Sequence, residues 1–469
     1  MGNRHTIPLI YLTSFLFLFG ECIQPAPRIA IYESVSCRQY YAKQDLHGAD
    51  CKVPAVQEEL SQLVGMERLS IIIPSLLAIP FAALADRVGH SFILSLAIFG
   101  VLLEDMFPLL ITWFDSVFPI RLIWLHFVFS VVGGGFTVVV TLLHVIVAQI
   151  IEEGERTAVF FRIRAAGVAG SVLGYAASGL LMRYNNWVPW IVGLTSLAVA
   201  TITARLIPIT RSIELHDDQS GPSGDTSVET RRSLHRRIAG DSKHVLQVLS
   251  GNRHLLVMLV LVFLCQLGFD AVPLMLAIFI SQRFAWSFAD ASFLNSTEMF
   301  MELLTLVVLL PVLSSYLPPS FQSLRPFKKE KYFAQWSIAA LCIGSFCLGI
   351  APTAHLAIAG VVVLAFGSGQ DSLLRSMATE LAPKSDTSIV YSALTMLRAI
   401  GGSVSGPLYA GLYSAGLKSG LSGLPFIISA AFFAIALVLC ITVADSESKT
   451  AKHDSRVVEE REQTEPLLG

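Results

Sequence analysis

The stretch Pro80-Phe-Ala-Ala-Leu-Ala-Asp-Arg-Val-Gly-His90 places two opposite charges between two apolar runs. The first run stops at Asp86 and Arg87, and the second begins at Phe92. Charged side chains are costly in hydrocarbon, so a charged pair at this position indicates a short polar loop between two membrane-spanning segments. Gly89 provides the turn in that loop.

The composition extends this interpretation to the whole chain. Of the 469 residues, 54% are hydrophobic and only 14% are charged, whereas a soluble domain has about 25% charged residues. The sequence therefore predicts a polytopic membrane protein embedded in a lipid bilayer. Its net charge of −2 and the lack of a basic stripe give no indication of a nucleic-acid partner.

Apolar segments long enough to cross a bilayer recur along the chain. A crossing takes about 20 residues, and the sequence contains twelve such segments. Their approximate extents are 7–32, 66–85, 91–113, 120–149, 158–182, 187–208, 254–281, 290–316, 332–351, 354–378, 387–413 and 423–444.

The segments divide into two groups of six. We expect an N-terminal bundle over 1–208, a cytosolic linker over 209–252, a C-terminal bundle over 253–445 and a disordered cytosolic tail over 446–469. Lys and Arg are concentrated in the linker, in the tail and in loops on the same side, which predicts that both termini are cytosolic.

Two features resemble a known family. Ala82-x-x-x-Asp86-Arg87-x-Gly89 resembles the loop between helices 2 and 3 of the major facilitator superfamily, with Ala82 in place of the usual glycine and His90 where that pattern has basic residues. The halves also repeat at an offset of 234, which aligns Arg164-Ala-Ala-Gly with Arg398-Ala-Ile-Gly. Parallel repeats of this kind form the two halves of that superfamily. The resemblance implies an all-α fold of twelve transmembrane helices in two pseudo-symmetric six-helix bundles.

The same resemblance implies a gating role for the loop residues Asp86, Arg87 and Gly89. Asp86 would pair with a cytosolic arginine and with the N-terminus of helix 11 near Ser388, and would lock the two halves in the outward-open state. The candidate arginines are Arg156, Arg162 and Arg164. The alternative is that the charges only set the topology of a tight loop.

Helix 5 has glycines at helical spacing. They are Gly167, Gly170, Gly174 and Gly179. The segment resembles the glycine-rich motif of antiporters in the family, with Tyr175 in place of a proline. Small residues let two helices approach closely. The motif favours export over import, and ordinary tight packing is the alternative.

Charged residues inside the apolar segments are candidates for proton coupling or substrate binding, because burying them is costly without a function. In helix 1, Glu21 precedes Arg28 by seven residues on the same face, with two prolines between them that should break the helix. Glu298 and Glu302 lie one turn apart in helix 8, where their negative charges would repel.

The remaining charged candidates are in the C-terminal half. Asp270 lies in helix 7 and Arg398 in helix 11, while Asp371 and Arg375 of helix 10 are four residues apart and can pair. In the family, helices 1, 4, 7 and 10 line the central cavity. The resemblance therefore implies that Glu21, Asp371 and one glutamate of helix 8 are the best proton-site candidates. The Glu104-Asp105 pair of helix 3 would be more peripheral.

Helix 4 has three further candidates. Phe129 occupies the position where proton-coupled exporters of the family have an arginine, and the helix instead contains Arg121, His126 and His144. The histidines are 18 residues apart, which is five turns of one continuous helix and places them on one face. A histidine in the cavity could titrate during transport. The alternative is a structural hydrogen bond.

The cysteines have no metal-ligand spacing, and we expect no metal. Cys37 and Cys51 share the polar loop after helix 1, where a disulfide is expected if that loop faces an oxidising compartment. The tail end, Glu462-Gln-Thr-Glu-Pro-Leu-Leu-Gly469, is similar to a dileucine sorting signal. A vacuolar membrane is therefore the alternative to the plasma membrane.

The sequence contains no nucleotide-binding loop and no catalytic cluster, so we predict neither an enzyme nor a cofactor. The outer end of helix 1 resembles filamentous-fungal members of the superfamily, many of them orphan or efflux transporters. We therefore predict a monomeric antiporter that exports a small organic compound by alternating access and is driven by protons. The alternatives are a proton-coupled nutrient importer and a non-transporting membrane sensor.

Overall fold

The computed structural model is helical throughout the residues it describes. These are residues 3–43, 50–69, 80–81, 84–151, 153–208, 253–305, 326–381 and 387–443. The predicted linker, the tail with its dileucine-like end, and parts of the second and eighth predicted helices lie outside them.

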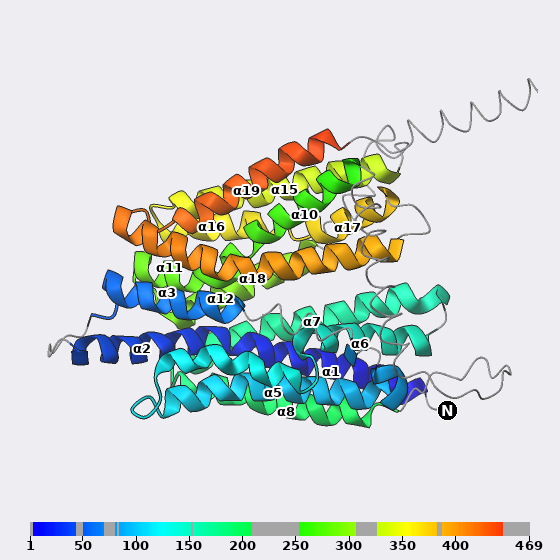
Figure 1. Ribbon diagram of the computed structural model, residues 1–469, viewed down its shortest axis with the longest axis horizontal. Coiled ribbons are helices and arrows are strands. Elements are labelled where there is room, and N and C mark those ends of the chain that lie inside the picture. The colour runs from blue at the N-terminus through cyan, green and yellow to red at the C-terminus, as the bar shows by residue number, and fades with distance from the viewer. Residues whose placement is uncertain are drawn as a thin grey trace, which may run out of the picture.

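The N-terminal bundle lies in the lower half of Figure 1. Helix 1 of the predicted set is divided at Gln24 into two helices, because Pro25 and Pro27 lack the backbone N–H groups that would continue the ladder. The elements of this bundle are α1 (Asn3–Ile23), α2 (Pro25–Lys43), α3 (Pro54–Leu69), α5 (His90–Trp113), the 3-10 helix η1 (Ile120–Val131), α6 (Gly135–Ile150), α7 (Glu153–Met182) and α8 (Trp187–Leu206).

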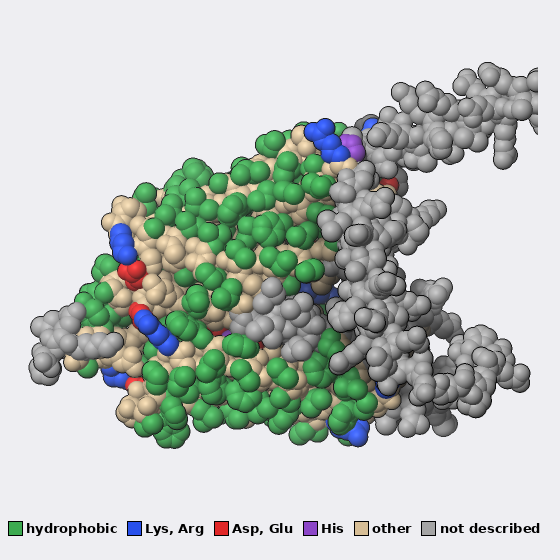
Figure 2. Space-filling view, in the orientation of Figure 1, with side chains coloured by type: hydrophobic (Ala, Val, Ile, Leu, Met, Phe, Trp, Pro, Cys, Tyr) green, Lys and Arg blue, Asp and Glu red, His purple; other side chains and the backbone are tan. Residues whose placement is uncertain are grey.

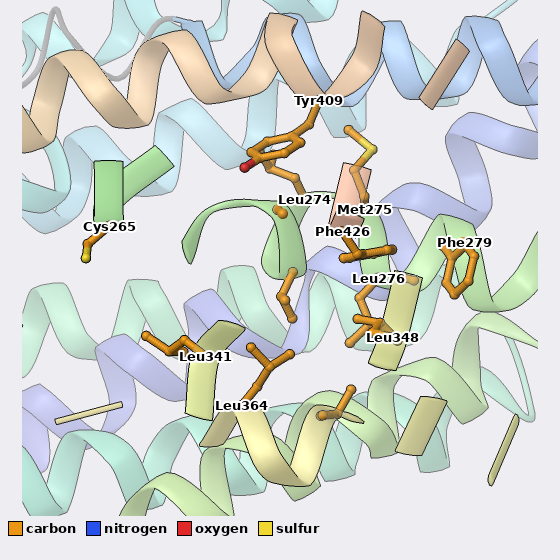
Figure 3. Close-up of a cluster of buried hydrophobic side chains, with 14 of the residues drawn as sticks. Cys265, Leu274, Met275, Leu276, Phe279, Leu341, Leu348, Leu364, Tyr409 and Phe426 are labelled. Atoms are coloured by element: carbon orange, nitrogen blue, oxygen red, sulfur yellow. The ribbon is translucent and has the colours of Figure 1, made fainter. Parts of the chain in front are cut away.

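The C-terminal bundle occupies the upper half of the same view (Figure 1). Its elements are α10 (Arg253–Phe269), α11 (Ala271–Phe284), α12 (Phe288–Leu304), α15 (Pro326–Ile350), α16 (Ala354–Ala365), α17 (Gln370–Leu381), α18 (Thr387–Ser419) and α19 (Leu424–Thr442). In its core, Leu341, Leu364 and Phe426 pack around the buried side chains of α11 (Figure 3).

The surface is that of a membrane protein. Figure 2 shows hydrophobic side chains covering the face over both bundles, with the coloured charged groups mainly near the two ends. Large apolar residues such as Trp336 and Ile202 are 75% and 61% exposed, as expected where side chains contact lipid.

Nine helical spans in the described residues are long and apolar enough to cross a bilayer. They are Thr6–Ala42, His90–Trp113, Ile120–Val147, Arg162–Met182, Trp187–Leu206, Arg253–Phe284, Phe327–Ile350, Ala354–Leu381 and Leu424–Thr442. Of the other three predicted segments, 66–85 and 290–316 are only partly described. The third is α18, whose Gly and Ser residues suit a helix packed between others.

Helix 4 is not the continuous α-helix that the sequence suggested. It consists of η1 and α6, separated by Gly133, Gly134 and Gly135, whose φ angles are 142°, 85° and 69°. Only glycine adopts such angles without strain. A Cβ at Gly133 would also lie 2.6 Å from the Cα of Ala97. The break therefore allows close packing on α5 and changes the direction of the side chains beyond it.

The two bundles contact each other through two pairs of helices. The α3 helix packs along α18, and α7 packs along α12. At the closest point of the first pair, a Cβ on Gly65 would lie 2.6 Å from the carbonyl oxygen of Gly406. Further contacts join α12 to α2 and α11 to α3. These involve the end of the molecule that carries the Cys37–Cys51 disulfide, here called the disulfide end; the opposite end is called the N-terminal end.

Candidate functional site

A group of charged side chains lies inside the N-terminal bundle, centred on Arg28 of α2. Its guanidinium pairs with Glu67 of α3 at 2.9 Å and with Asp105 of α5 at 2.7 Å. Gln24 donates a hydrogen bond of 2.9 Å to the same Asp105 carboxylate. The Arg28 guanidinium also lies 5.7 Å from the ring centroid of Trp190 in α8. Four elements therefore converge on one cation.

Glu21 belongs to the same group but does not pair with Arg28, although the two residues are seven apart along helix 1. Arg28 instead pairs with the carboxylates of α3 and α5. The Glu21 carboxyl instead lies within electrostatic range of Asp105, Glu104 and Arg28, and its Oε1 atom is buried without a hydrogen-bond partner among the described residues.

The two histidines of helix 4 do not share a face, which corrects the sequence prediction. His126 is 8% exposed and its Nδ1 lies 3.1 Å from the Glu104 carboxylate. His144 is exposed and contacts Phe160 and the backbone of its own helix. The glycine break before α6 is the reason. Arg121 pairs with Glu59 at 3.1 Å on the surface.

A second charged group lies in the C-terminal bundle. Asp371 of α17 pairs with Arg375 one turn later at 3.3 Å, as predicted, and also with Arg398 of α18. Asp270 precedes α11 at its break from α10, where Gln266 donates to both carboxylate oxygens at 3.0 and 3.1 Å.

Glu302 connects the two bundles. Its carboxylate accepts a 2.9 Å hydrogen bond from Arg164 of α7, one of the three arginines considered as partners of Asp86. Glu298, one turn earlier on α12, lines a small cavity with Glu302 and Ser368. Ser292 and Ser296 reinforce this contact by donating to backbone oxygens of Tyr175 and Val172 at 2.7 and 2.9 Å.

The predicted gating loop is described in part. Gly89 has a φ of 115°, as its role in the turn requires. The Asp86 carboxylate lies 3.1 Å from Nε2 of His90, and its side chain is 65% exposed. Arg87 is exposed. The side chains of Arg156 and Ser388, two of the expected Asp86 partners, lie outside the described residues.

The helix 5 glycines lie where other helices approach α7. A Cβ on Gly170 would be 2.5 Å from the Phe15 carbonyl oxygen, and one on Gly174 would be 2.8 Å from that of Phe19. Gly167 faces α1 in the same way. Gly179 instead contacts α12 in the other bundle, at Phe293.

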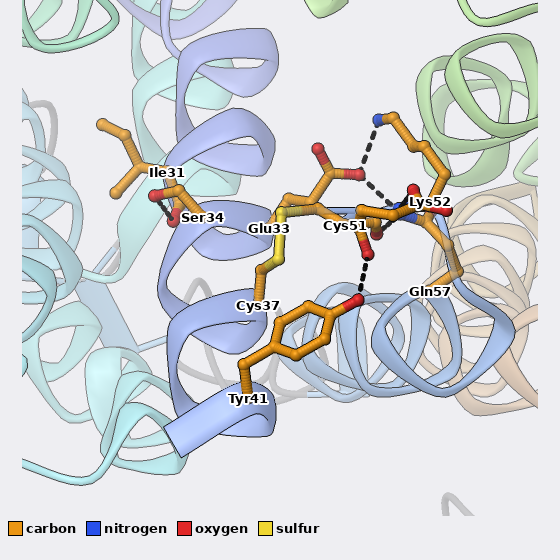
Figure 4. The surroundings of a disulfide bond; sticks show 9 residues. Ile31, Glu33, Ser34, Cys37, Tyr41, Cys51, Lys52 and Gln57 are labelled. Carbon is orange, nitrogen blue, oxygen red and sulfur yellow. Dashed lines mark hydrogen bonds and ion pairs between the residues drawn. A yellow bond between two sulfur atoms is a disulfide. The ribbon is translucent and has the colours of Figure 1, made fainter. Parts of the chain in front are cut away.

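The disulfide end is held together by polar contacts. The structure pairs Cys37 with Cys51 (Figure 4). The adjacent Lys52 lies 2.6 Å from the Glu33 carboxylate and 2.7 Å from the hydroxyl of Ser281, which belongs to the other bundle. Lys418 of α18 pairs with Glu58 of α3 at 2.9 Å, a second link across the bundles.

Several of these residues were missed from sequence. Glu67 falls at the start of the predicted segment 66–85, Lys52 lies outside every predicted segment, and Asp105 lies in helix 3, which the resemblance implies to be peripheral. One signal was available: Glu67, Glu104 and Asp105 are carboxylates within or beside apolar segments, and such residues require a partner. Which cation they share depends on how the helices pack.

The comparisons with known proteins give one consistent result. A model of the Major Facilitator Superfamily matches residues 59–406. The MFS efflux pump atnC of Emericella nidulans is 26% identical over 454 residues, which are 93% of this chain and 87% of that protein. The efflux pump ustT of Aspergillus flavus is 27% identical over 440 residues, covering 89% and 85%.

Solved structures agree in fold. The nucleoside transporter NupG superposes with a TM-score of 0.63 at 13% identity, covering 94% of this chain and 99% of that one. A D-xylose-proton symporter superposes with a TM-score of 0.62 at 15% identity, covering 94% of this chain and 98% of that one. These relatives are transporters and not enzymes.

Proposed function

This chain belongs to the major facilitator superfamily and is a multi-pass membrane transporter, and on that premise we propose that it exports a small organic compound in exchange for protons. The two bundles would alternate between a state closed at the disulfide end and a state closed at the N-terminal end. Asp86 and its loop would help to hold one of these states.

The arrangement of the bundle interface carries the transport part of the proposal. At the disulfide end, Lys52 and Lys418 link the two bundles, and Gly65 brings α3 against α18. The two lysine contacts are exposed or partly exposed polar contacts, which can be broken and re-formed at modest cost, as alternating access requires.

Proton coupling is supported by the number of carboxylates inside the bundles. Glu21, Glu67 and Asp105 interact with one permanent cation, Arg28, and Glu104 lies nearby against His126. Leaving this excess negative charge in a membrane interior is costly. Binding a proton removes part of the excess, and a carboxyl that gains and loses a proton can couple proton entry to a conformational change.

The direction of transport is supported by the names of the relatives, two of which are called efflux pumps, and by the close glycine contacts of α7. In this proposal the protein is a monomer in the plasma membrane, with the disulfide end outside and both termini in the cytosol. A disulfide is typical of an oxidising compartment.

The test compares cells that contain and cells that lack the gene, with untargeted mass spectrometry of the cell extract and of the medium. The variants are Asp86→Asn and Glu21→Gln. The control variant is Glu59→Gln, which removes a surface carboxylate that pairs with Arg121. Export predicts that at least one compound is retained in cells lacking the gene and in the two test variants, and that a protonophore abolishes the difference.

Two results would contradict the proposal. Lower accumulation in cells that lack the gene would indicate an importer. A growth phenotype without any change in compound distribution would indicate a sensor without transport activity.

A further inference from the structure

An unusual row of buried polar atoms follows one side of α1 and α2. Glu21, Gln24, Arg28, Tyr32 and Ser36 recur every three or four residues and so form one slowly winding stripe, here called the helix 1 stripe. Each has a side-chain polar atom that is buried and has no hydrogen-bond partner among the described residues. Natural proteins leave few buried polar atoms unpaired, so such a row requires an explanation.

The buried polar atoms of the stripe that have no partner within the described part of the chain include both donors and acceptors. Arg28 Nε and the Tyr32 hydroxyl can donate, and the Glu21 and Gln24 side-chain oxygens accept. Trp190 of α8 adds an unpartnered indole N–H beside Tyr32, the two rings lying 6.3 Å apart. Mixed donors and acceptors along a narrow path suit water, which can bond to both kinds.

The helix 1 stripe lies inside the N-terminal bundle and not between the bundles. Arg28 contacts α3, α5 and α8, while Gln24, Tyr32 and Trp190 are each 0% exposed. The stripe covers 15 residue steps, about 22 Å of helix. It runs from Glu21 in the middle of helix 1 to Ser36, the residue before Cys37 of the disulfide.

The charged and titratable groups gather at the inner part of the stripe. They are Glu21 and Cys22 of α1, Arg28 and Tyr32 of α2, Glu67 of α3, Glu104 and Asp105 of α5, His126 of η1, and Tyr175 of α7 beside Cys22. Glu21 and Asp105 lie close enough for their charges to interact.

We propose that the helix 1 stripe is a water-lined proton path that connects the disulfide end with a proton-holding pair, Glu21 and Asp105, inside the N-terminal bundle. The proton passes from water to one carboxylate oxygen of the pair. When Asp105 accepts it, the ion pair with Arg28 weakens, and Arg28 keeps Glu67 as its partner. The proton then leaves to water when the pair is exposed to the other side.

This inference rests on the proposed proton coupling but places the proton away from the interface where the substrate would cross. It also assigns Asp105 a role that its position on helix 3 did not suggest. Tyr32 and Ser36 are positioning residues that hold water in the path.

The test needs no transported compound. Dicyclohexylcarbodiimide reacts with protonated carboxyls in apolar surroundings, and mass spectrometry locates the adduct. Sealed right-side-out vesicles that contain the full chain are labelled with the pH set separately on each side. A carboxyl that titrates within the range goes from about a tenth to about nine-tenths protonated over two pH units, so labelling should change about ninefold.

We expect Glu21 or Asp105 to be labelled, and the labelling to follow the pH at the disulfide end. Ser36→Leu should slow this response about tenfold by filling the path with an apolar side chain. The matched control is Ser34→Leu on the same helix, because Ser34 is exposed and its position two residues from both Tyr32 and Ser36 puts it on another face of the helix. Tyr32→Phe removes only a hydroxyl, and it is the second test variant if Ser36→Leu does not fold.

Labelling that follows only the pH at the N-terminal end would overturn the path, as would the absence of label from both carboxyls. The path would also be overturned if labelling responded to the pH equally fast in Ser36→Leu and Ser34→Leu while Tyr32→Phe left the response unchanged. If cells show no export but the labelling behaves as expected, the path stands and the proposed export fails.

Discussion

Replacing Gly65 by alanine should shift the protein away from the state seen here, because α3 and α18 of the two bundles approach each other closely at Gly65. A Cβ at this position would lie 2.6 Å from both the Gly406 carbonyl oxygen and the Cβ of Ala410. Comfortable carbon–oxygen contacts are about 3.3–3.6 Å. The α3 and α18 backbones would therefore have to separate by up to about 1 Å.

The cost of that separation can be estimated. Overpacking a closely packed contact destabilises it by about 1–3 kcal/mol. The proposed alternating access would separate these two bundles, so the penalty would apply to the state closed at the disulfide end and not to the fold of either bundle. The ratio of closed to open molecules should fall about 5- to 150-fold.

Double electron–electron resonance between nitroxide labels can measure this ratio. Ala55 of α3 and Ser419 of α18 are both exposed near the disulfide end, and labelled cysteines there report the separation of the bundles. The five free cysteines are first replaced, and the protein is studied in lipid nanodiscs. Gly65→Ala should move population from the shorter to the longer distance.

Gly411→Ala is the matched control, since it lies on α18 and a Cβ there meets nothing within 4 Å. It should leave the distance distribution unchanged. The reasoning is refuted if Gly65→Ala and Gly411→Ala give the same distribution while both remain folded. It is also refuted if Gly65→Ala unfolds the N-terminal bundle.

Three further predictions concern charged groups and the disulfide. Arg28→Met leaves two buried carboxylates without their cation and should cost about 3–5 kcal/mol, measured as a lower thermal unfolding temperature in detergent; an unchanged temperature would mean that Arg28 is dispensable to the cluster. Cys37→Ser removes the bond to Cys51, across a sequence separation of 14 residues, and should cost about 3 kcal/mol; reductant should lower the unfolding temperature of the parent protein but not of the variant. Lys418→Met should change the distance between the same two spin labels little, since exposed ion pairs contribute only about 0–1 kcal/mol. Lys52→Met removes a partly buried contact to both bundles and should open the disulfide end measurably more. A larger opening in Lys418→Met than in Lys52→Met would contradict the proposal that Lys52 is the stronger link.

The sequence by itself determined the membrane character, the superfamily and much of the local structure. Apolar runs of bilayer length identify membrane segments because every backbone group must be satisfied inside the helix there. The prolines at 25 and 27 predicted the break in helix 1, and the spacing of Asp371 and Arg375 predicted their ion pair. Each of these rests on residues close together in the chain.

Only the tertiary structure decided which distant charges meet. Arg28 had an apparent partner seven residues away, yet it pairs with Glu67 and Asp105 of two other helices. Arg164 pairs across the bundles with Glu302. The direction of a side chain depends on every break before it, and the three glycines between η1 and α6 changed the direction of His144. Partner choice in a helical membrane protein is therefore fixed by the register and packing of whole helices, which local spacing does not contain.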